Sequence, residues 1–508
     1  MAQKAMQINS VEDVTKSVKI PILESCIELP IEEETLIELT QKAKDWAIMH
    51  GAGMRSKTNF SSDSLNFAPF ILTPCSFPRK QFEKALKIQT VLNELTHSIA
   101  HDEEFLKKTL AETIKVDEFT GNLYKIYEKI LSEGISQPIS LGLLRSDLML
   151  ESRCHGSIEN ANKSLCDYDW KQVELNTIAS GFGHLGPISK SIQSYVLAEL
   201  GAYDKLVNLP ENNALFGICN AMIKAWEIYG NDEAVILFII EDISYNICDQ
   251  RFHEFEIRQM NPKIKVIRKT LTQIYNQSKL GPNKELIVGG HHISVVYFRA
   301  GYEPGHYPSQ NEWDARLLIE RSKAIKCPTI YYHLAGTKKV QQALSEPGMV
   351  ERFIKDPATV AEVRNIFTGL YPLDDTNEGN AAYVLAMQDP ERFVLKPQRE
   401  GGGNNVYGLD IPDALKKMSK TERKAWILMD RILPPISKGY MIRPGGPIPP
   451  PIVDLVSELG IFGAIIGDAK SIKINYMAGH MFRTKISTAN EGGVAAGLGA
   501  LDSPYMVD

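Results

Sequence analysis

The stretch Lys396-Pro-Gln-Arg-Glu-Gly-Gly-Gly-Asn-Asn-Val-Tyr407 is the most informative part of the chain. Three consecutive glycines allow backbone N–H groups to approach a ligand closely. Lys396 precedes them at the end of a predicted strand, and the carboxylate of Glu400 adjoins them. This combination suits the phosphates and the metal ion of a nucleoside triphosphate. The alternative is a glycine-rich surface turn, and the G-x-x-x-x-G-K-S/T pattern of a P-loop is absent.

A carboxylate and a carboxamide alternate along a second predicted strand. Residues 173–178 alternate apolar and polar side chains, as a half-buried strand does. Glu174 and Asn176 are two residues apart, so both project from one face. Their oxygen atoms are of the kind that Mg²⁺ prefers. The pair is a candidate magnesium site, and the alternative is a polar strand face in contact with water.

Two cations and a run of small residues lie near the C-terminus. Arg483 and Lys485 face the same way if the chain there is extended. The run Glu491-Gly-Gly-Val-Ala-Ala-Gly497 follows, and its composition is typical of a mobile lid. The alternative is a flexible tail, which the scarcity of polar residues in the run disfavours.

The rest of the chain alternates helical and strand patterns. Residues 1–30 are mixed and predict an extended arm, whereas apolar three- and four-residue steps predict helices from Glu34 to Gly51 and over roughly 80–135. The apolar run 234–240 predicts a strand buried on both faces. A Gly289-Gly290 pair further on predicts a hairpin turn. Residues 232–336 therefore form a predicted α/β unit inserted in a larger chain.

Composition limits the classes of function. Net charge is −6, from 56 basic and 62 acidic residues among 508, without the basic excess of a nucleic-acid binder. The longest apolar run is too short to span a bilayer. Seven widely spaced cysteines without a C-x-x-C predict free thiols in a reducing compartment. The N-terminus lacks an apolar signal core, so we expect a cytoplasmic protein, with a secretion signal already removed as the alternative.

Four ordered segments resemble eukaryotic glutathione synthetases, a family of ATP-grasp ligases. They are Leu-Ala-Gly-Thr-Lys-Lys-Val-Gln-Gln (334–342), Lys-Pro-Gln-Arg-Glu-Gly-Gly-Gly-Asn-Asn (396–405), Ser-Glu-Leu-Gly-Ile-Phe-Gly (457–463) and Gly-Gly-Val-Ala-Ala-Gly (492–497). Weaker similarity runs from about residue 34 to the end. The resemblance implies an α/β ATP-grasp fold with helical N-terminal elements and an inserted parallel α/β substrate-binding domain, and it implies a homodimer. The expected parts are 1–231 and 337–508 for the ATP-grasp body and 232–336 for the insert.

The resemblance also implies ligation of γ-glutamylcysteine and glycine to glutathione, with ATP and Mg²⁺, through an acyl-phosphate. The metal ligands it implies are Glu174, Asn176 and Glu400, and the catalytic cations are Arg483, Lys396 and Lys338. The ATP-binding residues it implies are Glu174, Lys338, Lys396, Glu400, Gly401, Gly402, Asn405, Tyr407, Met429, Asp430, Ile432, Glu458, Lys485 and Glu491. The substrate-binding positions are Arg145, Ala179, Ser180, Gly181, Ser244, Asn246, Gln250, Arg299, Tyr302, Arg483, Val494 and Ala495.

The chain departs from the family pattern at positions that should meet the peptide. The family usually has serines after the strand of Asn176, and this chain has Ala179-Ser180-Gly181. Ser244 stands where the family has a glutamate, and Ala300 where it often has an aspartate. Loss of a charged partner in a desolvated site costs about 2–5 kcal/mol. Weak binding of the usual peptide, or another peptide, is therefore expected unless something compensates.

Three functions are consistent with these residues, and they are given from the most to the least favoured. The first is glutathione synthesis, with glycine as acceptor because Val494-Ala-Ala496 is similar to the family members that use glycine. The second is the same chemistry on a different acyl or amine substrate. The third is a non-catalytic nucleotide-binding protein, which the intact Glu174, Asn176, Glu400 and Lys396 disfavour.

Overall fold

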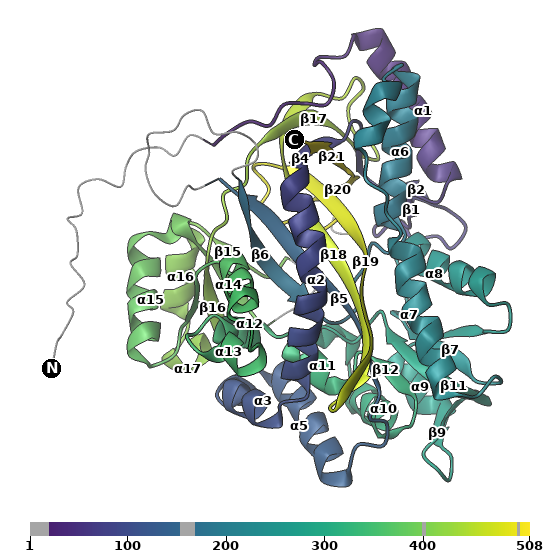
Figure 1. Cartoon of the computed structure of the whole chain (residues 1–508), viewed down its shortest axis with the longest axis vertical. Coiled ribbons are helices and arrows are strands. Elements are labelled where there is room, and N and C mark those ends of the chain that lie inside the picture. The colour runs from purple at the N-terminus through teal and green to yellow at the C-terminus, as the bar shows by residue number, and fades with distance from the viewer. Residues whose placement is uncertain (1–19, 153–167, 399–402, 495–497) are drawn as a thin grey trace.

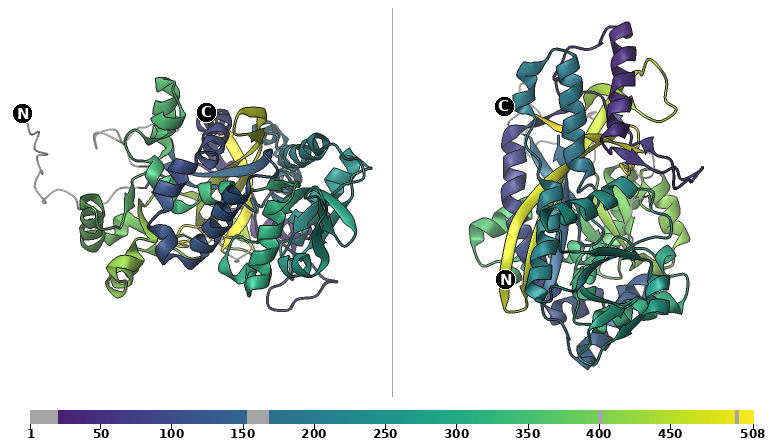
Figure 2. Two further views of the ribbon diagram at one scale, coloured as in Figure 1. Left: turned by 90° about the horizontal axis from the view of Figure 1, so that it is seen from below. Right: turned by 90° about the vertical axis from the view of Figure 1, so that its right-hand side faces the viewer.

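The computed structural model of the chain describes residues 20–152, 168–398, 403–494 and 498–508, and three sheets organise it (Figure 1). The long hairpin of β18 (Ile452–Asp468) and β19 (Ser471–Ile486) runs through the middle of the molecule. The other two sheets lie on opposite sides of this hairpin, as the left panel of Figure 2 shows. The fold is a mixed α/β fold of the ATP-grasp type, as the sequence predicts.

The central sheet has seven strands in the order β17-β3-β20-β19-β18-β5-β6. Besides the long hairpin, its strands are β17 (Ser437–Ile442), β3 (Phe70–Ile71), β20 (Gly499–Asp502), β5 (Ser140–Glu151) and β6 (Asp169–Asn176). Helix α2 (Arg79–Ala100) covers one face and α7 (Ala214–Tyr229) the other. Odd-numbered residues of β18 such as Ile461 cluster with α2, and even-numbered ones such as Phe462 cluster with α7. This is the period of two that a strand imposes.

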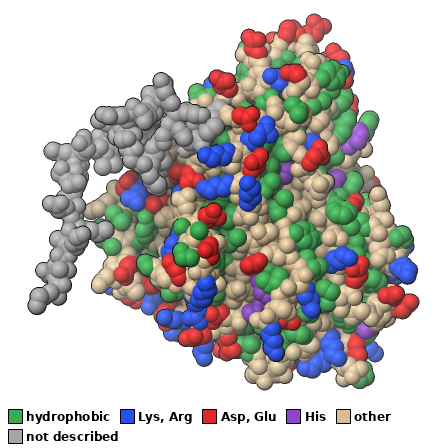
Figure 3. All heavy atoms as spheres, in the orientation of Figure 1, with side chains coloured by type: hydrophobic (Ala, Val, Ile, Leu, Met, Phe, Trp, Pro, Cys, Tyr) green, Lys and Arg blue, Asp and Glu red, His purple; other side chains and the backbone are tan. Residues whose placement is uncertain are grey.

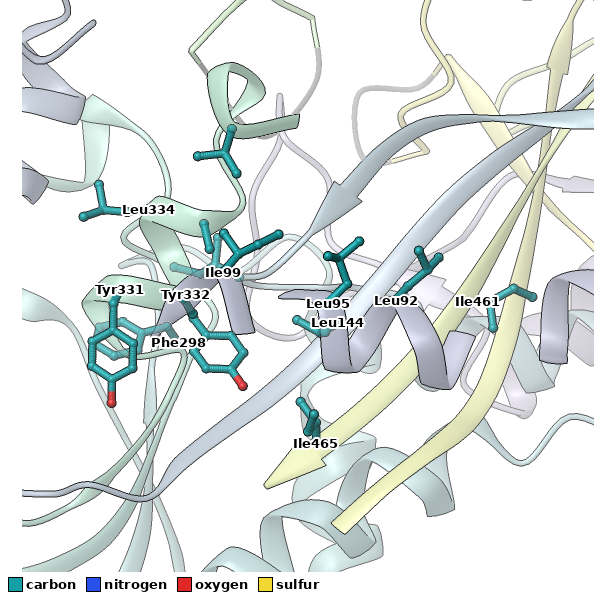
Figure 4. Packing of buried hydrophobic residues seen from close by; sticks show 14 of the residues in the cluster. Leu92, Leu95, Ile99, Leu144, Phe298, Tyr331, Tyr332, Leu334, Ile461 and Ile465 are labelled. Carbon is teal, nitrogen blue, oxygen red and sulfur yellow. The ribbon is translucent and has the colours of Figure 1, made fainter. Parts of the chain in front are cut away.

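The largest hydrophobic core lies between α2 and the central sheet (Figure 4). Leu92 and Leu95 of α2 lie over Ile461 and Leu144 of the sheet, while Tyr332 packs at the end near Ile99. Each of these side chains is at most 4% exposed. Burial of one such side chain contributes about 1.5–3 kcal/mol, so this helix–sheet contact fixes the strands that carry the polar residues described below.

The second sheet has six strands from the region between residues 235 and 327. Its strands are β8 (Val266–Lys269), β7 (Val235–Ile239), β11 (His291–Phe298), β12 (Ile325–Cys327), β10 (Leu286–Val288) and β9 (Ser278–Leu280), and the first four pair in parallel. The β10–β11 pair is antiparallel, with Val288 opposite His291. Gly289 and Gly290 both have positive φ, as a two-residue hairpin turn requires. The predicted turn and the buried strand are confirmed, and the domain boundaries stay a prediction.

The third sheet is antiparallel, with strands β13 (Leu370–Pro372), β16 (Trp426–Asp430), β14 (Phe393–Pro397) and β15 (Val406–Tyr407) in that order. Helices α15 (Asn377–Gln388) and α16 (Asp410–Lys417) cover its outer face, where Phe393, Leu395 and Leu428 are buried. Its inner face is turned toward β5 and β6 (Figure 1). The space between the third sheet and the central sheet holds the site.

The remaining elements form the scaffold. The helices are α1 (Glu33–Met49), α3 (Glu103–Leu110), α4 (Thr113–Val116), α5 (Glu118–Glu133), α6 (Leu185–Glu199), α8 (Ile247–Met260), α9 (Leu271–Gln277), α10 (Gln310–Arg321), α11 (Ile330–Ala335), α12 (Lys338–Leu344), α13 (Met349–Phe353), α14 (Pro357–Ile366) and α17 (Lys420–Arg423). The remaining strands are β1 (Gly53–Met54), β2 (Asn66–Phe67), β4 (Cys75–Pro78) and β21 (Pro504–Val507). Within the described ranges, none of the helices has the length and apolar character needed to cross a membrane. Acidic and basic side chains are interspersed on the face in Figure 3, in keeping with their near balance in the sequence.

Candidate active site

A cavity of about 340 Å³ lies between the third sheet and the β5–β6 and β18–β19 strands. Both sheets contribute polar side chains to the cavity, and apolar side chains line one end of it. The predicted residues that line it are Glu174, Asn176, Lys396, Asn405, Tyr407, Met429, Asp430, Ile432, Glu458, Lys485, Glu491, Arg145, Ala179, Tyr302 and Arg483. Residues assigned to the nucleotide, the metal and the peptide therefore share one space.

The register of β5 against β6 places four polar residues together. Arg145 lies opposite Asn176, and Asp147 lies opposite Glu174. Asp147 is fully buried and accepts two hydrogen bonds from Arg145, at 2.6 Å from Nε and 2.7 Å from Nη2. The Asn176 amide donates to the same carboxylate at 3.0 Å, and Arg483 Nη2 lies 3.7 Å away. Asp147 therefore orients both arginines and leaves the Asn176 carbonyl oxygen as the acceptor for a cation.

Lysines converge on Glu174 from two other elements. Lys338, at the start of α12, lies 2.9 Å from Glu174 Oε2, and Lys396 of β14 donates to the Val173 carbonyl at 2.9 Å. Burial alone would raise the pKa of Glu174, but the charges of Lys338, Lys396 and Arg483 outweigh it and hold that pKa well below its usual range. Glu174 is therefore ionised at neutral pH, as a metal ligand must be.

The β18–β19 hairpin places Glu458 directly opposite Arg483, and Val456 opposite Lys485. Arg483 Nη2 donates to Glu458, yet burial and the nearby carboxylates of Asp147 and Glu174 raise the pKa of Glu458. Burial lowers the pKa of Lys485, whose ammonium donates to the Asn490 carbonyl at 2.6 Å. Arg483 and Lys485 thus place two cations beside the cavity, where they can meet an anionic ligand.

One end of the cavity is apolar. Val394 of β14 pairs with Met429 of β16, and Ile432 and Leu433 follow β16 on the same wall. This end has the character that a purine base needs, because ligand pockets are mostly apolar with few polar groups. The phosphates of a nucleotide would then extend toward Lys396 and Lys485.

Two loops meet over the phosphate end. Glu491 accepts a hydrogen bond from the Gly403 backbone N–H at 2.9 Å and another from the Tyr407 hydroxyl at 3.3 Å. Asn405 donates to the same hydroxyl at 3.1 Å. The glycine-rich segment and the C-terminal loop are thus joined through Glu491. Glu400, Gly401, Gly402 and Ala495 lie outside the described residues.

The segment that follows β6 is fixed by three buried charges. Arg299 donates to the Ala179 carbonyl at 3.2 Å, and Arg145 donates to the Gly181 carbonyl at 3.1 Å. Asp249 forms an ion pair with Arg299 at 3.2 Å. Ala179 has φ 52°, a left-handed conformation that favours glycine and often occurs at functional sites. Ser180 turns its hydroxyl away, to the Leu143 carbonyl.

The predicted residues Ser244, Asn246 and Gln250 form a separate cluster around Arg268. Arg268 Nη2 donates to Ser244 Oγ at 3.2 Å and to Gln250 Oε1 at 2.7 Å, and Gln250 donates to Asn246 at 2.7 Å. Among the described residues, none of these three lines the cavity, and neither does Arg299 or Val494. Ala300 is buried. Arg299 itself contacts the cavity wall through the Ala179 carbonyl.

Several residues of the site were not predicted from the sequence. Asp147 is one, although the Arg145-x-Asp147 spacing places both on one strand face. Ile20, Met149 and Leu433 are apolar wall residues that carry no chemical signal of their own. Ile20 in particular belongs to the predicted N-terminal arm, far from the site in sequence.

The donor set of Glu174 and Asn176 suits Mg²⁺. No group of three or more His, Cys, Asp and Glu side chains converges in the part of the chain that is described. Mg²⁺ is commonly held by one or two carboxylates together with substrate phosphates and water, rather than by an all-protein cage. The residues present therefore fit a nucleotide-bound magnesium ion.

Two facing sheets, with lysines, arginines and carboxylates in the cavity between them, are the arrangement of an ATP-dependent ligase of the ATP-grasp class. A family model described as eukaryotic glutathione synthase, ATP binding domain, matches residues 33–506, and the chain belongs to this family. It is 42% identical over 479 residues to glutathione synthetase of Homo sapiens, covering 94% of this chain and 98% of that protein. It is 37% identical to the chloroplastic glutathione synthetase of Arabidopsis thaliana, covering 94% and 86%.

A solved structure is also similar. It is the apo form of a glutathione synthetase-like effector from Globodera pallida, with a TM-score of 0.74 and 26% sequence identity. The match covers 94% of this chain and 98% of that one. The family, the fold and the use of ATP predicted from the sequence are confirmed.

Proposed function

We propose that the chain joins γ-glutamylcysteine to glycine, with cleavage of ATP and with Mg²⁺. The observation that carries this proposal is the Lys338–Glu174 pair, which lies with Arg145 and Arg483 of the central sheet and Lys396 of the third sheet around one cavity. Arginines can hold a carboxylate bidentately. Lys338 and Lys396 can neutralise the phosphates of ATP, which would otherwise repel that carboxylate.

The chemistry proceeds in two balanced steps. The C-terminal carboxylate of the peptide attacks the terminal phosphorus of ATP, and ADP leaves. The neutral glycine amine then attacks the acyl carbon, phosphate leaves as the peptide bond forms, and the nitrogen loses one proton to water. Mg²⁺, when bound by Glu174 and Asn176, supplies positive charge to the phosphates. The contact of Glu491 with Gly403 and Tyr407 joins the two loops that would keep water from the acyl-phosphate.

The test is ADP release with ATP, Mg²⁺, γ-glutamylcysteine and glycine, with mass spectrometry of the product. We expect one ADP for each glutathione formed. Glu174→Gln keeps the size of the side chain but removes its charge, so it should lower kcat by about 100-fold or more. ATP binding without any product would contradict the proposal and lead to the second candidate.

The second candidate is the same chemistry on another peptide or amine. Its support is Ser244, whose hydroxyl accepts from Arg268 and offers no negative charge to a substrate ammonium. A panel of dipeptides and amines should then give product where γ-glutamylcysteine does not. Ser244→Glu should strengthen γ-glutamylcysteine binding, and an unchanged affinity would remove residue 244 as a determinant.

We also infer a cytoplasmic homodimer. The support for a dimer is a set of exposed apolar side chains on α1 and on the 3₁₀ helix Tyr203–Asn208, which packs on α6, the neighbour of α1. These side chains are Ile37, Ile48, Met49, Tyr203 and Val207. The support for a reducing compartment is that the cysteines in the described ranges are free and buried. Light scattering that gave the mass of one chain would contradict the dimer.

A further inference from the structure

The segment of residues 20–26, which we name the strap, pairs with the wall of the nucleotide cavity. The family model begins at residue 33, so the strap lies outside the matched region. Leu23 N–H donates to the Ile436 carbonyl at 2.7 Å, and Ile436 N–H donates to the Pro21 carbonyl at 2.9 Å. Ile22 and Ile436 form a parallel bridge. The strap therefore satisfies both backbone groups of Ile436, a residue that itself lines the cavity.

Further contacts fix the strap to the body of the protein. Ser76 donates to the Glu24 carbonyl at 2.6 Å, and Ser25 donates to the Lys438 carbonyl at 3.1 Å. Leu23 is buried in the main core, and Cys26 is buried in a small cluster with Leu209. Because the strap has buried anchors as well as backbone pairing, its position relative to the cavity is defined.

Ile20 is the strap residue that reaches the cavity. The parallel bridge of Ile22 with Ile436 places Ile20 level with Pro434. Both residues line the cavity, together with Ile432 and Leu433 of the apolar end. The exposed fraction of Ile20 is 37%, whereas Ile22, two residues on, is 59% exposed and is not among the lining residues. The strap thus presents one isoleucine to the cavity and another to solvent.

We propose that the strap completes the base-binding end of the nucleotide pocket, and that Ile20 contacts the purine ring and sets nucleotide affinity. This inference rests on the proposed function, because it requires that ATP binds in this cavity. An apolar side chain that loses water when the base binds strengthens binding in proportion to the area covered. A charge at the same position would be desolvated by the base, and that desolvation opposes binding.

The experiment compares Ile20→Asp and Ile20→Ala with Ile22→Asp in the full chain. Dissociation constants are measured by calorimetry for a non-hydrolysable ATP analogue with Mg²⁺ and for inorganic triphosphate with Mg²⁺. We expect Ile20→Asp to weaken the nucleotide by about tenfold and Ile20→Ala by about three- to fivefold. Ile22→Asp should bind as the parent does. Triphosphate occupies only the phosphate end, so its affinity should be the same in all four proteins.

Equal nucleotide affinity in Ile20→Asp and the parent would overturn the inference. An equal loss for nucleotide and triphosphate would also overturn it, because the strap would then act on the whole site rather than on the base. A parent that bound triphosphate but not nucleotide would refute the strap's role, whereas a parent that bound neither would refute the proposed function as well.

Discussion

Asp147 accepts hydrogen bonds from Arg145 and Asn176 and lies close to Arg483, without reaching the cavity surface itself. Its role is to position these groups. A carboxylate with no solvent exposure is stable here because cations surround it on the same face of the sheet. We therefore expect the affinity of the site for a peptide carboxylate to depend on a residue that does not touch the substrate.

Asp147→Asn tests this role. The change leaves Arg145 without its buried anionic partner, and loss of one member of such a pair costs about 3–5 kcal/mol. We expect that loss in the free energy of unfolding, from urea denaturation. In addition, KM for the peptide should rise by about tenfold or more while KM for ATP changes little.

Asp169→Asn is the matched control, because Asp169 belongs to the neighbouring strand and forms a partly exposed pair with Lys84 at 3.1 Å. Its cost should be below about 1 kcal/mol. Equal peptide KM values for Asp147→Asn and the parent would contradict a positioning role.

Spacing along single strands predicts much of the site at the residue scale. The two-residue period of a strand places Glu174 and Asn176 on one face, and it does the same for Arg483 and Lys485. All four side chains line the cavity. The cluster of Ser244 with Arg268 could not be predicted, because it depends on how α8 packs against β8. The sequence contains the residues but not the packing of the helix on the strand.

At the scale of elements, the approach of α7 to β19 depends on a glycine. A Cβ at Gly217 would lie 2.4 Å from the Ala478 carbonyl oxygen and 2.9 Å from its Cα. Both are backbone atoms, so a larger residue requires the helix to move. Gly479, the next residue of β19, is equally close to Ala214 of the helix.

Gly217→Ala should therefore destabilise the protein by about 1–3 kcal/mol, the usual cost of overpacking. Thermal unfolding followed by circular dichroism measures this. Gly305→Ala is the control, since the nearest atom to its added Cβ would be a side-chain oxygen at 3.6 Å. Similar melting temperatures for the two variants would show that α7 can shift at little cost.

Some elements follow directly from sequence patterns, and others do not. Helix α1 buries Leu36, Leu39 and Ala43 at the predicted steps, and all five residues of β7 are buried. The β18–β19 hairpin was not predicted. Residues 459–466 of β18 are buried under helices on both faces, so no alternation marks this strand. The position of this hairpin therefore cannot be read from the sequence pattern, because tertiary packing determines it.

At the scale of the molecule, a buried acid links stability to pH. Burial raises the pKa of Asp502 to about 6 from its ordinary value of 3.8, although Gln193 and Thr484 donate to it. The folded protein then binds a proton more tightly than the unfolded chain. The contribution of Asp502 to the free energy of unfolding is present in full below about pH 4 and is lost as pH rises to about 6.

Asp502→Asn removes this dependence, because the amide resembles the protonated acid. Relative to the variant, the free energy of unfolding of the parent should fall by about 2–3 kcal/mol between about pH 4 and pH 6. Melting temperatures of the two proteins across that range measure it, and all other ionisable groups are shared. Curves that run parallel would show that Asp502 keeps an ordinary pKa.

The central sheet is completed by the end of the chain. Strand β20 pairs with β19 and β3, and β21 lies parallel to β4. During synthesis, β3 and β4 leave the ribosome long before β20 and β21 are made, so these two strands wait for their partners to emerge. A nascent chain therefore lacks the pairing between β19 and β3 across the central sheet until β20 has emerged.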